Sequence, residues 1–269
     1  MLGSSRDALG TCRDFLDEQR QDSDFENLAG ELYSVADLLD SESVLRSALA
    51  DSGQLTAVRE NLAQDVFASR VSPLALQLIR LAAVQRWSEG MDLVLALEQL
   101  AEQAVLTVAQ NDGSLDATEE ELFLFGRAVD GSAELQMALT DPASSSEVKA
   151  AIVRDLVAAR GTRAAATLLG YSISHLHGRR IDSVVSHLVE MAAKQRDRVV
   201  ADIKVAAPLT PEQSQRLAQA LSQLKGRTVR LNVAVDPSVL GGVHVAIGEE
   251  VIDGTIESRL EQARRALLG

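Results

Sequence analysis

The sequence has few of the residues that build covalent or metal-centred sites. Its only cysteine is Cys12, so no disulfide can form within the chain. The four histidines are His175, His177, His187 and His244. The first two stand two positions apart, which would point them to different faces of a helix, and the others are isolated, so no metal-ligand spacing is present. We therefore expect no metal site and no cofactor.

Long apolar runs are also missing. No uninterrupted stretch approaches the ~20 residues that a bilayer-spanning helix needs. The amino terminus, MLGSSRDALG, has neither the basic nor the apolar region of a signal peptide. With 46% apolar residues in 269 positions, the chain can still bury a genuine core. These features predict a globular protein of the cytosolic type, whose attachment to a membrane must go through another chain.

Positive charge is scarce as well. The chain carries 26 Lys and Arg against 39 Asp and Glu, a net charge of −13, which makes the phosphate backbone of nucleic acid a poor partner. Residues 1–110 carry 8 basic and 18 acidic side chains, residues 111–197 carry 9 and 13, and residues 198–269 carry 9 and 8. This change in charge predicts a domain boundary near residue 200, although an acidic excess is usually only a solvated face.

No catalytic motif stands out. The pair Gly241-Gly242 lacks the Gly-Lys-Ser/Thr of a phosphate loop and precedes a strand, so it predicts a turn or a bulge. Asp253-Gly254 is typical of a turn. No nucleophile has a neighbouring base in the pattern, and we expect no enzymatic activity.

An internal repeat is present. Residues 31–95 can be aligned with residues 121–185 without gaps, at a constant offset of 90 positions. In this alignment, identical residues occur at a number of positions. Glu31 aligns with Glu121 and Leu49 with Leu139, and the helix-capping residues Ser72 and Thr162 also align. We infer a duplication that produces two similar helical bundles in series.

Apolar periodicity predicts helices through the first two thirds of the chain. Capping boxes, in which a hydroxyl and a Glu three residues later satisfy each other's amides, indicate starts at Thr118 and Ser144. The stretch 73–87 is apolar on nearly every side, as in a helix that is central to its bundle or partly covered by a partner. The expected helices are 4–19, 25–40, 42–51, 54–70, 73–87, 89–111, 118–130, 132–140, 145–160, 163–177 and 179–197.

Beyond residue 198 the apolar period changes from 3.6 to 2, which indicates strands. A helix capped by Thr210, Pro211 and Gln213 lies between the first two strands, and a short return through Val-Ile-Asp precedes a last helix from about Gly254. We predict an α+β fold that is mainly α: a six-helix bundle over 1–111, a second bundle over 112–197, and a small β-α-β-β-(β)-α domain over 198–269.

The segment VDPSVLGGVHVAIGEEVIDGTIESRLEQARRAL resembles the carboxy-terminal signature of the delta subunit of F-type ATP synthases, the family of the mitochondrial oligomycin-sensitivity-conferring protein. VVADIKVAAPLTPEQSQRLAQAL is similar to the segment that precedes it in that family, and the helices upstream look like the family's amino-terminal bundle. The duplication departs from the ordinary subunit and looks like a long bacterial form.

The resemblance implies a non-catalytic stator in the peripheral stalk of an ATP synthase, on the cytoplasmic face of the bacterial membrane. Such a subunit links the catalytic head, through amino-terminal helices of alpha subunits, to the membrane b subunit and resists rotor torque. Its b-binding motif corresponds here to Gly241, Gly242, Asp253, Gly254, Arg259, Leu260 and Arg264. The alternative is a free-standing helical adaptor or regulatory protein.

The family seats an alpha helix between its first and fifth helices, which points to Leu9, Phe15, Leu78 and Leu81 as contacts in the first bundle. For each of these residues, packing in the bundle core is the alternative. Ile256, Leu260, Ala263 and Leu267 form an apolar stripe on the expected last helix, which either covers the small sheet or faces b.

Overall fold

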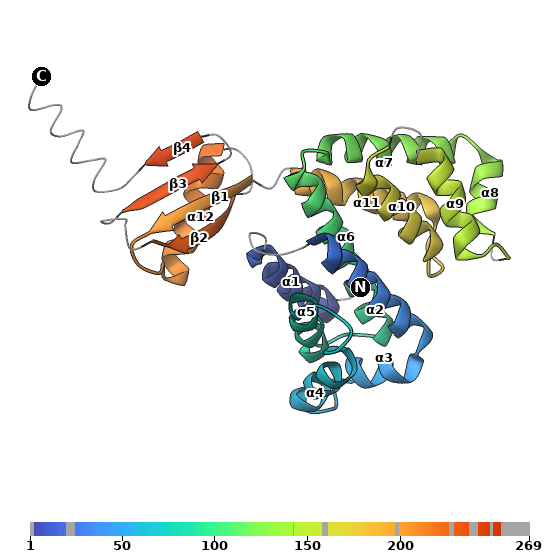
Figure 1. Ribbon diagram of the computed structural model, residues 1–269, viewed down its shortest axis with the longest axis horizontal. Helices are drawn as coiled ribbons and strands as arrows, with labels where there is room; N and C mark the ends of the chain where they lie inside the picture. The colour runs from blue at the N-terminus through green and yellow to red at the C-terminus, as the bar shows by residue number, and fades with distance from the viewer. Residues whose placement is uncertain are drawn as a thin grey trace, which may run out of the picture. The chain divides into compact units, whose positions relative to one another are not determined.

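The computed structural model describes residues 3–19, 25–141, 143–157, 161–196, 199–225, 229–236, 242–247 and 250–253. The chain divides into two compact units, Met1–Gln195 and Arg196–Gly269 (Figure 1). Both expected bundles lie in the first unit, and the expected carboxy-terminal domain corresponds to the second. The expectation of a mainly helical α+β fold is confirmed. The boundary between the two bundles at residue 112 stays a prediction.

The first unit is built from amphipathic helices, whose apolar faces meet in a common core. Their ends agree with the sequence pattern to within a few residues, because local periodicity sets them. The helices are α1 (Gly3–Glu18), α2 (Phe25–Ser41), α3 (Ser43–Ala50), α4 (Thr56–Phe67), α5 (Pro73–Val84), α6 (Gly90–Asn111), α7 (Leu115–Asp130), α8 (Ala133–Thr140), α9 (Ser146–Val157), α10 (Arg163–Ser174) and α11 (Ile181–Arg196).

The structure repeats the offset of 90 residues in one specific polar contact. Glu31 accepts hydrogen bonds from the amide and the hydroxyl of Ser72, at 2.8 and 2.6 Å, and Ser72 caps α5. Glu121 accepts the same two bonds from Thr162, at 2.7 and 2.8 Å, and Thr162 caps α10. A glutamate at the equivalent position therefore fixes the start of the fifth helix in each copy.

Helix α6 belongs to both copies. At an offset of 90, α2 to α6 correspond to α7 to α11, and α1 corresponds to residues 93–108, which lie within α6. Packing follows this correspondence, since α1 packs on α5 and α6 packs on α10. No residue from Asp92 to Ala109 is exposed. We call α1 to α6 the first copy and α6 to α11 the second copy.

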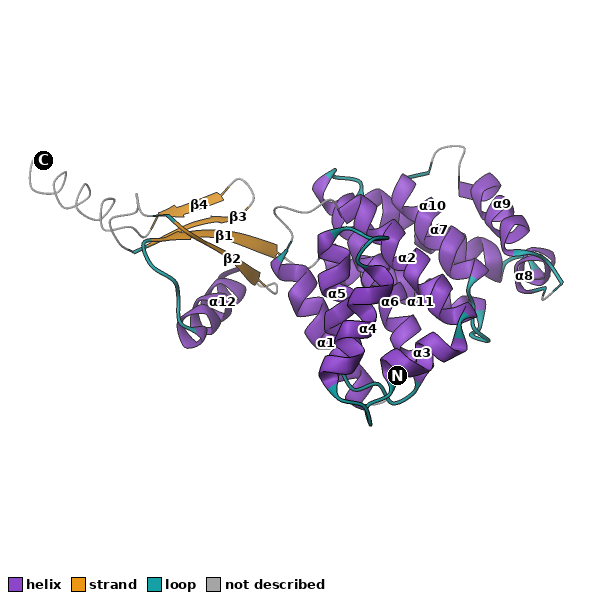
Figure 2. Ribbon diagram, turned by 60° about the horizontal axis from the view of Figure 1, so that its bottom comes forward, coloured by secondary structure: helices purple, strands orange, loops and turns teal. Residues whose placement is uncertain are grey.

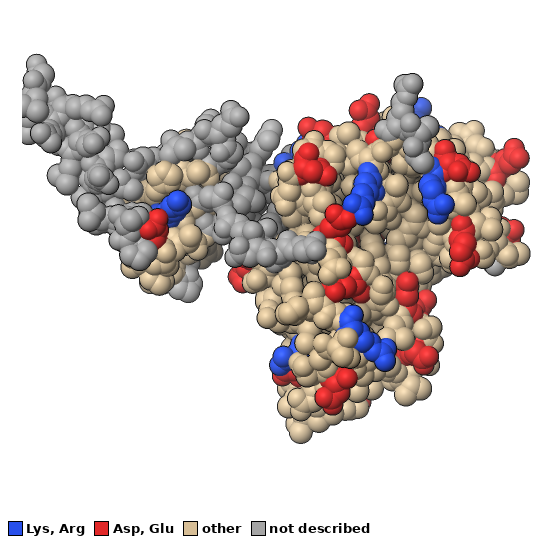
Figure 3. All heavy atoms as spheres, in the orientation of Figure 1, with Lys and Arg blue, Asp and Glu red and all other residues tan. Residues whose placement is uncertain are grey.

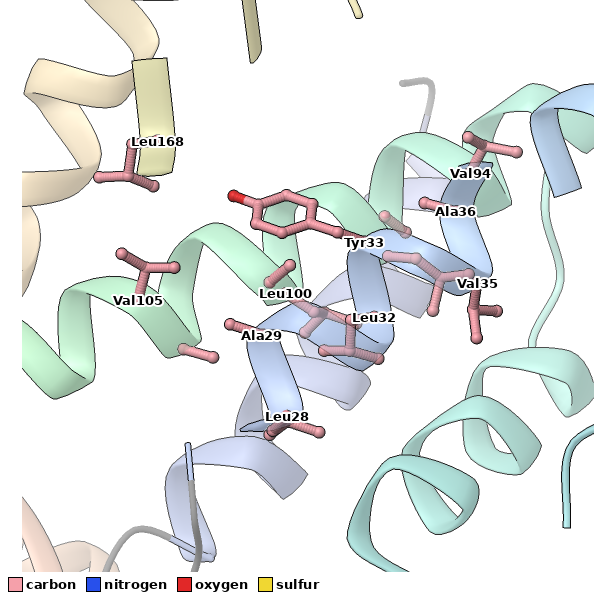
Figure 4. Close-up of a cluster of buried hydrophobic side chains, with 14 of the residues drawn as sticks. Leu28, Ala29, Leu32, Tyr33, Val35, Ala36, Val94, Leu100, Val105 and Leu168 are labelled. Carbon is pink, nitrogen blue, oxygen red and sulfur yellow. The ribbon is translucent and has the colours of Figure 1, made fainter. Parts of the chain in front are cut away.

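Side chains from both copies form one continuous core. In Figure 4, Leu100 of α6 lies beside residues of α2, while Val105 of α6 and Tyr33 of α2 point toward the side on which Leu168 of α10 lies. Because the cluster continues across α6, the two duplicated segments pack against each other and do not form separate domains joined by a linker.

Three local predictions need correction. Helix α7 begins at Leu115, three residues before Thr118, because Thr118 donates to the carbonyl of Ser114 inside the first turns instead of capping. Helix α9 begins at Ser146, where the hydroxyl of Ser145, and not Ser144, accepts the capping amide at 3.4 Å. Helix α5 ends at Val84, before Trp87.

The second unit contains a four-stranded sheet, drawn in orange in Figure 2, with the order β2-β1-β3-β4. Its strands are β1 (Val199–Val205), β2 (Val229–Val235), β3 (Val243–Ile247) and β4 (Glu250–Asp253). β1 pairs in parallel with β2 and antiparallel with β3, and β3 pairs antiparallel with β4. The crossover from β1 to β2 is helix α12 (Pro211–Lys225).

Helix α12 covers one face of this sheet (Figure 2). Leu221 packs into a small cluster with Ala201, Ile203 and Val245. The capping box at the start of α12 is confirmed, since Thr210 and Gln213 exchange bonds of 2.8 and 3.2 Å. The expected last helix, with Ile256, Leu260, Ala263 and Leu267, lies outside the described residues.

Candidate partner-binding surfaces

Helix α1 lies against α5 and α6 and is held there by polar contacts. The Ser5 hydroxyl donates to buried Asp92 at 2.7 Å and accepts from the amide of Ser88 at 2.8 Å. Further along, Arg13 donates to Gln99 at 2.8 Å. These bonds fix the rotation of α1, so that its opposite side, which includes Asp7, Thr11, Asp14 and Glu18, faces solvent.

The four residues proposed to contact an alpha helix fall into two pairs. Leu9 and Leu78 are core residues, with exposed fractions of 5% and 0%. Phe15 and Leu81 are half-buried at the edge of the core. Phe15 and Leu81 therefore stay partly accessible at the surface, whereas Leu9 and Leu78 do not.

Helix α5 presents a partly exposed apolar stripe. Leu74, Leu81 and Val84 are half-buried, and Gln77 on the same side is exposed. Their successive spacings of three, four and three positions place them along one side of the helix. Phe15 of α1, which packs against α5, is likewise half-buried.

The equivalent surface of the second copy is occupied by the chain itself. There, α6 takes the place of α1 and is covered on all sides. Tyr171, the counterpart of Leu81, stacks on Tyr33 of α2 with ring centroids 3.8 Å apart and donates to Asp37 at 2.6 Å. Among the described residues, the first copy therefore leaves the outer side of α1 and the Leu81 position of α5 open, whereas α6 is covered and Tyr171 is engaged in the second copy.

The junction between the copies is a polar cluster that sequence reasoning missed. Buried Glu98 of α6 meets His177 at 2.7 Å and Arg179 at 3.5 Å, and buried Glu102 meets Ser172 at 3.1 Å and His187 at 3.6 Å. The His177 side chain in this cluster is only 11% exposed. Two carboxylates within an otherwise apolar helical pattern were the available signal.

Two tyrosines complete the junction. Burial, together with the nearby carboxylates of Glu102 and Glu98, raises the pKa of Tyr33 well above its ordinary value. Burial and the hydrogen bond to Asp37 raise the pKa of Tyr171 in the same direction. His175 stacks on Tyr171 from the other side, at 4.1 Å between centroids. The neutral phenols thus pack as flat apolar surfaces, and the Tyr171 hydroxyl stays a donor.

A buried arginine closes the end of α5. The guanidinium of Arg59 donates to the carbonyls of Ala83, Val84 and Gln85 at 2.6, 3.2 and 2.7 Å. These carbonyls lie at the carboxyl end of a helix, where a positive charge is favoured. Arg59 therefore supports the apolar stripe of α5 from within the bundle.

The second unit contains only part of the proposed b-binding motif within the described residues. Gly242 precedes β3 with a φ of +87°, a left-handed conformation that favours glycine, and it is exposed. Asp253 is the last residue of β4 and lies opposite His244 of β3 in the strand register. Gly241, Gly254, Arg259, Leu260 and Arg264 lie outside the described residues.

The acidic residues of the helical unit are dispersed. Figure 3 shows carboxylates scattered over the visible face, with lysines and arginines between them. Within the described ranges, no helix is long and apolar enough to cross a membrane. Among the same residues, no three His, Cys, Asp or Glu side chains gather as a metal ion would require.

Comparisons with known proteins agree with this picture. Residues 101–267 match the model of the family described as ATP synthase delta (OSCP) subunit. A protein named ATP synthase subunit delta from Streptomyces coelicolor is 41% identical, with 99% of this chain and 98% of that protein covered. Proteins of the same name from Kineococcus radiotolerans and Frankia casuarinae are 37% and 38% identical, the first covering 99% of this chain and 98% of that protein, the second 100% of each.

Among solved structures, a chain of the Toxoplasma gondii mitochondrial ATP synthase hexamer matches 62% of this chain and 95% of its own length. Its TM-score is 0.28 at 21% identity, so it supports no argument about this fold. The family match is more informative, because it begins at residue 101, within α6. It thus spans most of the second copy and the sheet-containing unit, and the first copy lies almost wholly outside it.

Proposed function

Because the chain belongs to the ATP synthase delta (OSCP) subunit family, we propose that it is a non-catalytic stator of the peripheral stalk. In this role it connects the alpha and beta head to the b subunit and resists the torque of the rotor. Full-length similarity to delta subunits carries the proposal. Several helix contacts in series suit this mechanical task better than one deep pocket.

We place the alpha contact on α1 and α5 of the first copy. The support is accessibility: Phe15 and Leu81 border an open apolar stripe, whereas Tyr171, the counterpart of Leu81, is engaged with Tyr33 and Asp37. The carboxylates on the outer side of α1 would also attract a basic segment.

A matched pair of labels tests this placement in the full chain. Gln77 on α5 and Thr167 on α10 are both exposed and stand 90 residues apart, so they occupy equivalent positions. A fluorophore on Gln77→Cys should respond to a peptide of the alpha amino terminus, and one on Thr167→Cys should not. Buried Cys12 does not compete for the label.

Leu81→Glu should weaken binding of the same peptide at least tenfold, because it places a charge in the apolar contact. A response at Thr167→Cys alone would move the alpha site to the second copy. If neither label responds in a chain that still joins the complex, the amino-terminal helix of the alpha subunit is not the partner of these surfaces.

We propose that the second unit binds b through Gly241, Gly242, Asp253, Gly254, Arg259, Leu260 and Arg264. The family resemblance of the motif supports this, and Gly242 is exposed beside β3. The double variant Arg259→Glu, Arg264→Glu should lose co-purification with the soluble part of b. Arg216→Glu, at an exposed position on α12, is the control that should keep it.

The proposed place of action is the cytoplasmic face of the bacterial membrane, with b as the link to the bilayer. A free-standing adaptor is the second candidate. Isolation of the ATP synthase from the native membrane separates the two, because a stator must be present in the purified complex in a fixed amount. Absence of the chain from an intact, coupled complex would favour the adaptor.

A further inference from the structure

The two copies differ in the face formed by their second and sixth helices. In the first copy this face is α2 with α6, and it is covered by α10 and the turn that follows it. In the second copy it is α7 with α11, and nothing in the described part of the first unit covers it. A cleft of about 330 Å³ opens there, which we call the α7–α11 cleft. It is lined by Leu122, Phe123, Gly126, Arg127, Val129, Asp130, Asp182, Val185, Ser186, Val189 and Glu190.

The contact residues of the covered face have direct counterparts in this cleft. At an offset of 90, Tyr33 corresponds to Phe123, Asp37 to Arg127 and Asp40 to Asp130. In the first copy these three positions respectively stack on Tyr171, accept its hydroxyl and approach His177 at 3.9 Å. The open face therefore repeats the arrangement of the α2–α6 face that α10 covers. It has one aromatic ring followed by two charged positions, each about one helical turn further along.

The exposure of this surface in the free chain is costly. Phe123 is 54% exposed, although a phenyl ring has no polar atom to offer to water. Gly126 lets α7 approach α11, since a Cβ there would lie 3.2 Å from Val185 Cγ1. Beside the ring, Val189 is half-buried. A partner side chain that entered the cleft would cover all three.

We propose that the α7–α11 cleft docks an amphipathic helix of another subunit of the same assembly, in the way that α2 and α6 receive α10. The helix presents an aromatic or large apolar side chain to Phe123, an acidic residue to Arg127 and a basic residue to Asp130. The reversed sign at Arg127, where the first copy has Asp37, excludes the α10 sequence itself as the preferred occupant. This inference rests on the proposed stator function, because that function supplies the partner subunits.

Photocrosslinking in the assembled complex tests the proposal. A photoreactive phenylalanine analogue replaces Phe123 or, as the control, Met137, which is 67% exposed on α8 and lies outside the cleft. The label at Phe123 should join another subunit within a helical segment that carries the stated acidic and basic residues. The label at Met137 should give at least tenfold less product.

Charge reversal gives a second measurement. Arg127→Glu should raise the rate at which the subunit dissociates from the complex at least threefold, and Met137→Glu should leave it unchanged. Equal crosslinking at both positions, or unchanged dissociation with Arg127→Glu, would overturn the docking site. If the unmodified chain does not co-purify with the complex at all, it is the stator function that fails.

Discussion

The two copies of the helical unit have the same helices and the same capping carboxylate, yet they offer different surfaces. The first copy exposes its first and fifth helices, because α1 has a free outer side. The second copy has α6 in that place, and α6 is covered. Conversely, the first copy's face of α2 and α6 is sealed by Tyr171 and His177, whereas the equivalent α7–α11 cleft is open.

This difference shows how a tandem duplication yields two binding sites without two identical ones. A shared helix removes one surface from each copy: the α1-type surface from the second and the α2–α6 face from the first. The remaining open surfaces lie on different copies and are lined by different side chains. Four experiments on variants of the isolated chain test how firmly each part of this comparison holds.

The largest effect should come from the junction. Glu98→Ala leaves His177 and Arg179 without their buried partner and should lower the free energy of unfolding by about 4 kcal/mol. Glu190→Ala removes an exposed pair with Lys194 on α11 and should cost no more than about 0.5 kcal/mol. Urea unfolding of both variants measures the difference. Equal losses would mean that Glu98 does not hold the copies together.

The next largest loss of stability should distinguish two residues at equivalent positions of the two copies, Arg59 and Lys149. Arg59→Ala should cost about 2–3 kcal/mol, because three carbonyls at the end of α5 lose a charged donor. Lys149 stands 90 residues later and is half-buried, and Lys149→Ala should change stability by less than about 0.5 kcal/mol. Thermal unfolding followed by circular dichroism compares them. A larger loss for Lys149→Ala would contradict the asymmetry between the copies.

The duplicated caps should respond alike. Ser72→Ala and Thr162→Ala each remove a hydroxyl that caps a helix and bonds to a glutamate, so each should cost about 1–2 kcal/mol. Denaturant unfolding should show two losses within about 0.5 kcal/mol of each other. A loss in only one variant would mean that the repeated contact has kept its function in only one copy.

The smallest effect concerns Cys12, which stands 90 residues before Glu102. Burial raises the pKa of the Cys12 thiol from about 9 to about 12, so the folded chain favours the neutral form. Stability is therefore fully present below about pH 9 and falls as pH rises above that value, because only the unfolded thiol ionises. Relative to Cys12→Ala, the wild-type chain should lose about 1 kcal/mol between pH 8 and pH 10. Identical pH profiles would place the thiol in contact with water.

Much of the fold follows from local pattern. Apolar spacing locates the helices of the first unit, and the change to alternation locates the strands that begin at Val199, because both periods arise from the backbone itself. The offset of 90 also predicts the matching caps at Ser72 and Thr162. The capping box at Thr118 was wrong for an instructive reason: Glu121 bonds to Thr162, 41 residues away, and not to its own helix start.

The candidate surfaces were less predictable, because they depend on distant packing. Leu9 and Phe15 lie on the same helix, and only the placement of α1 on α6 decides that one is buried and the other accessible. The contact of Tyr171 with Asp37 spans 134 positions, and no local pattern encodes it. The same is true of the α7–α11 cleft, which is recognisable only after its covered counterpart is seen.

Helix α6 also has a mechanical consequence. Its 22 residues run without a break through both copies, a length of roughly 33 Å at 1.5 Å per residue. Two bundles joined by a flexible loop would act as a hinge, whereas two bundles built around one continuous helix act as a rigid beam. A partner bound at α1 and α5 would thus fix the position and orientation of the α7–α11 cleft, so that a second contact would form with little further loss of entropy.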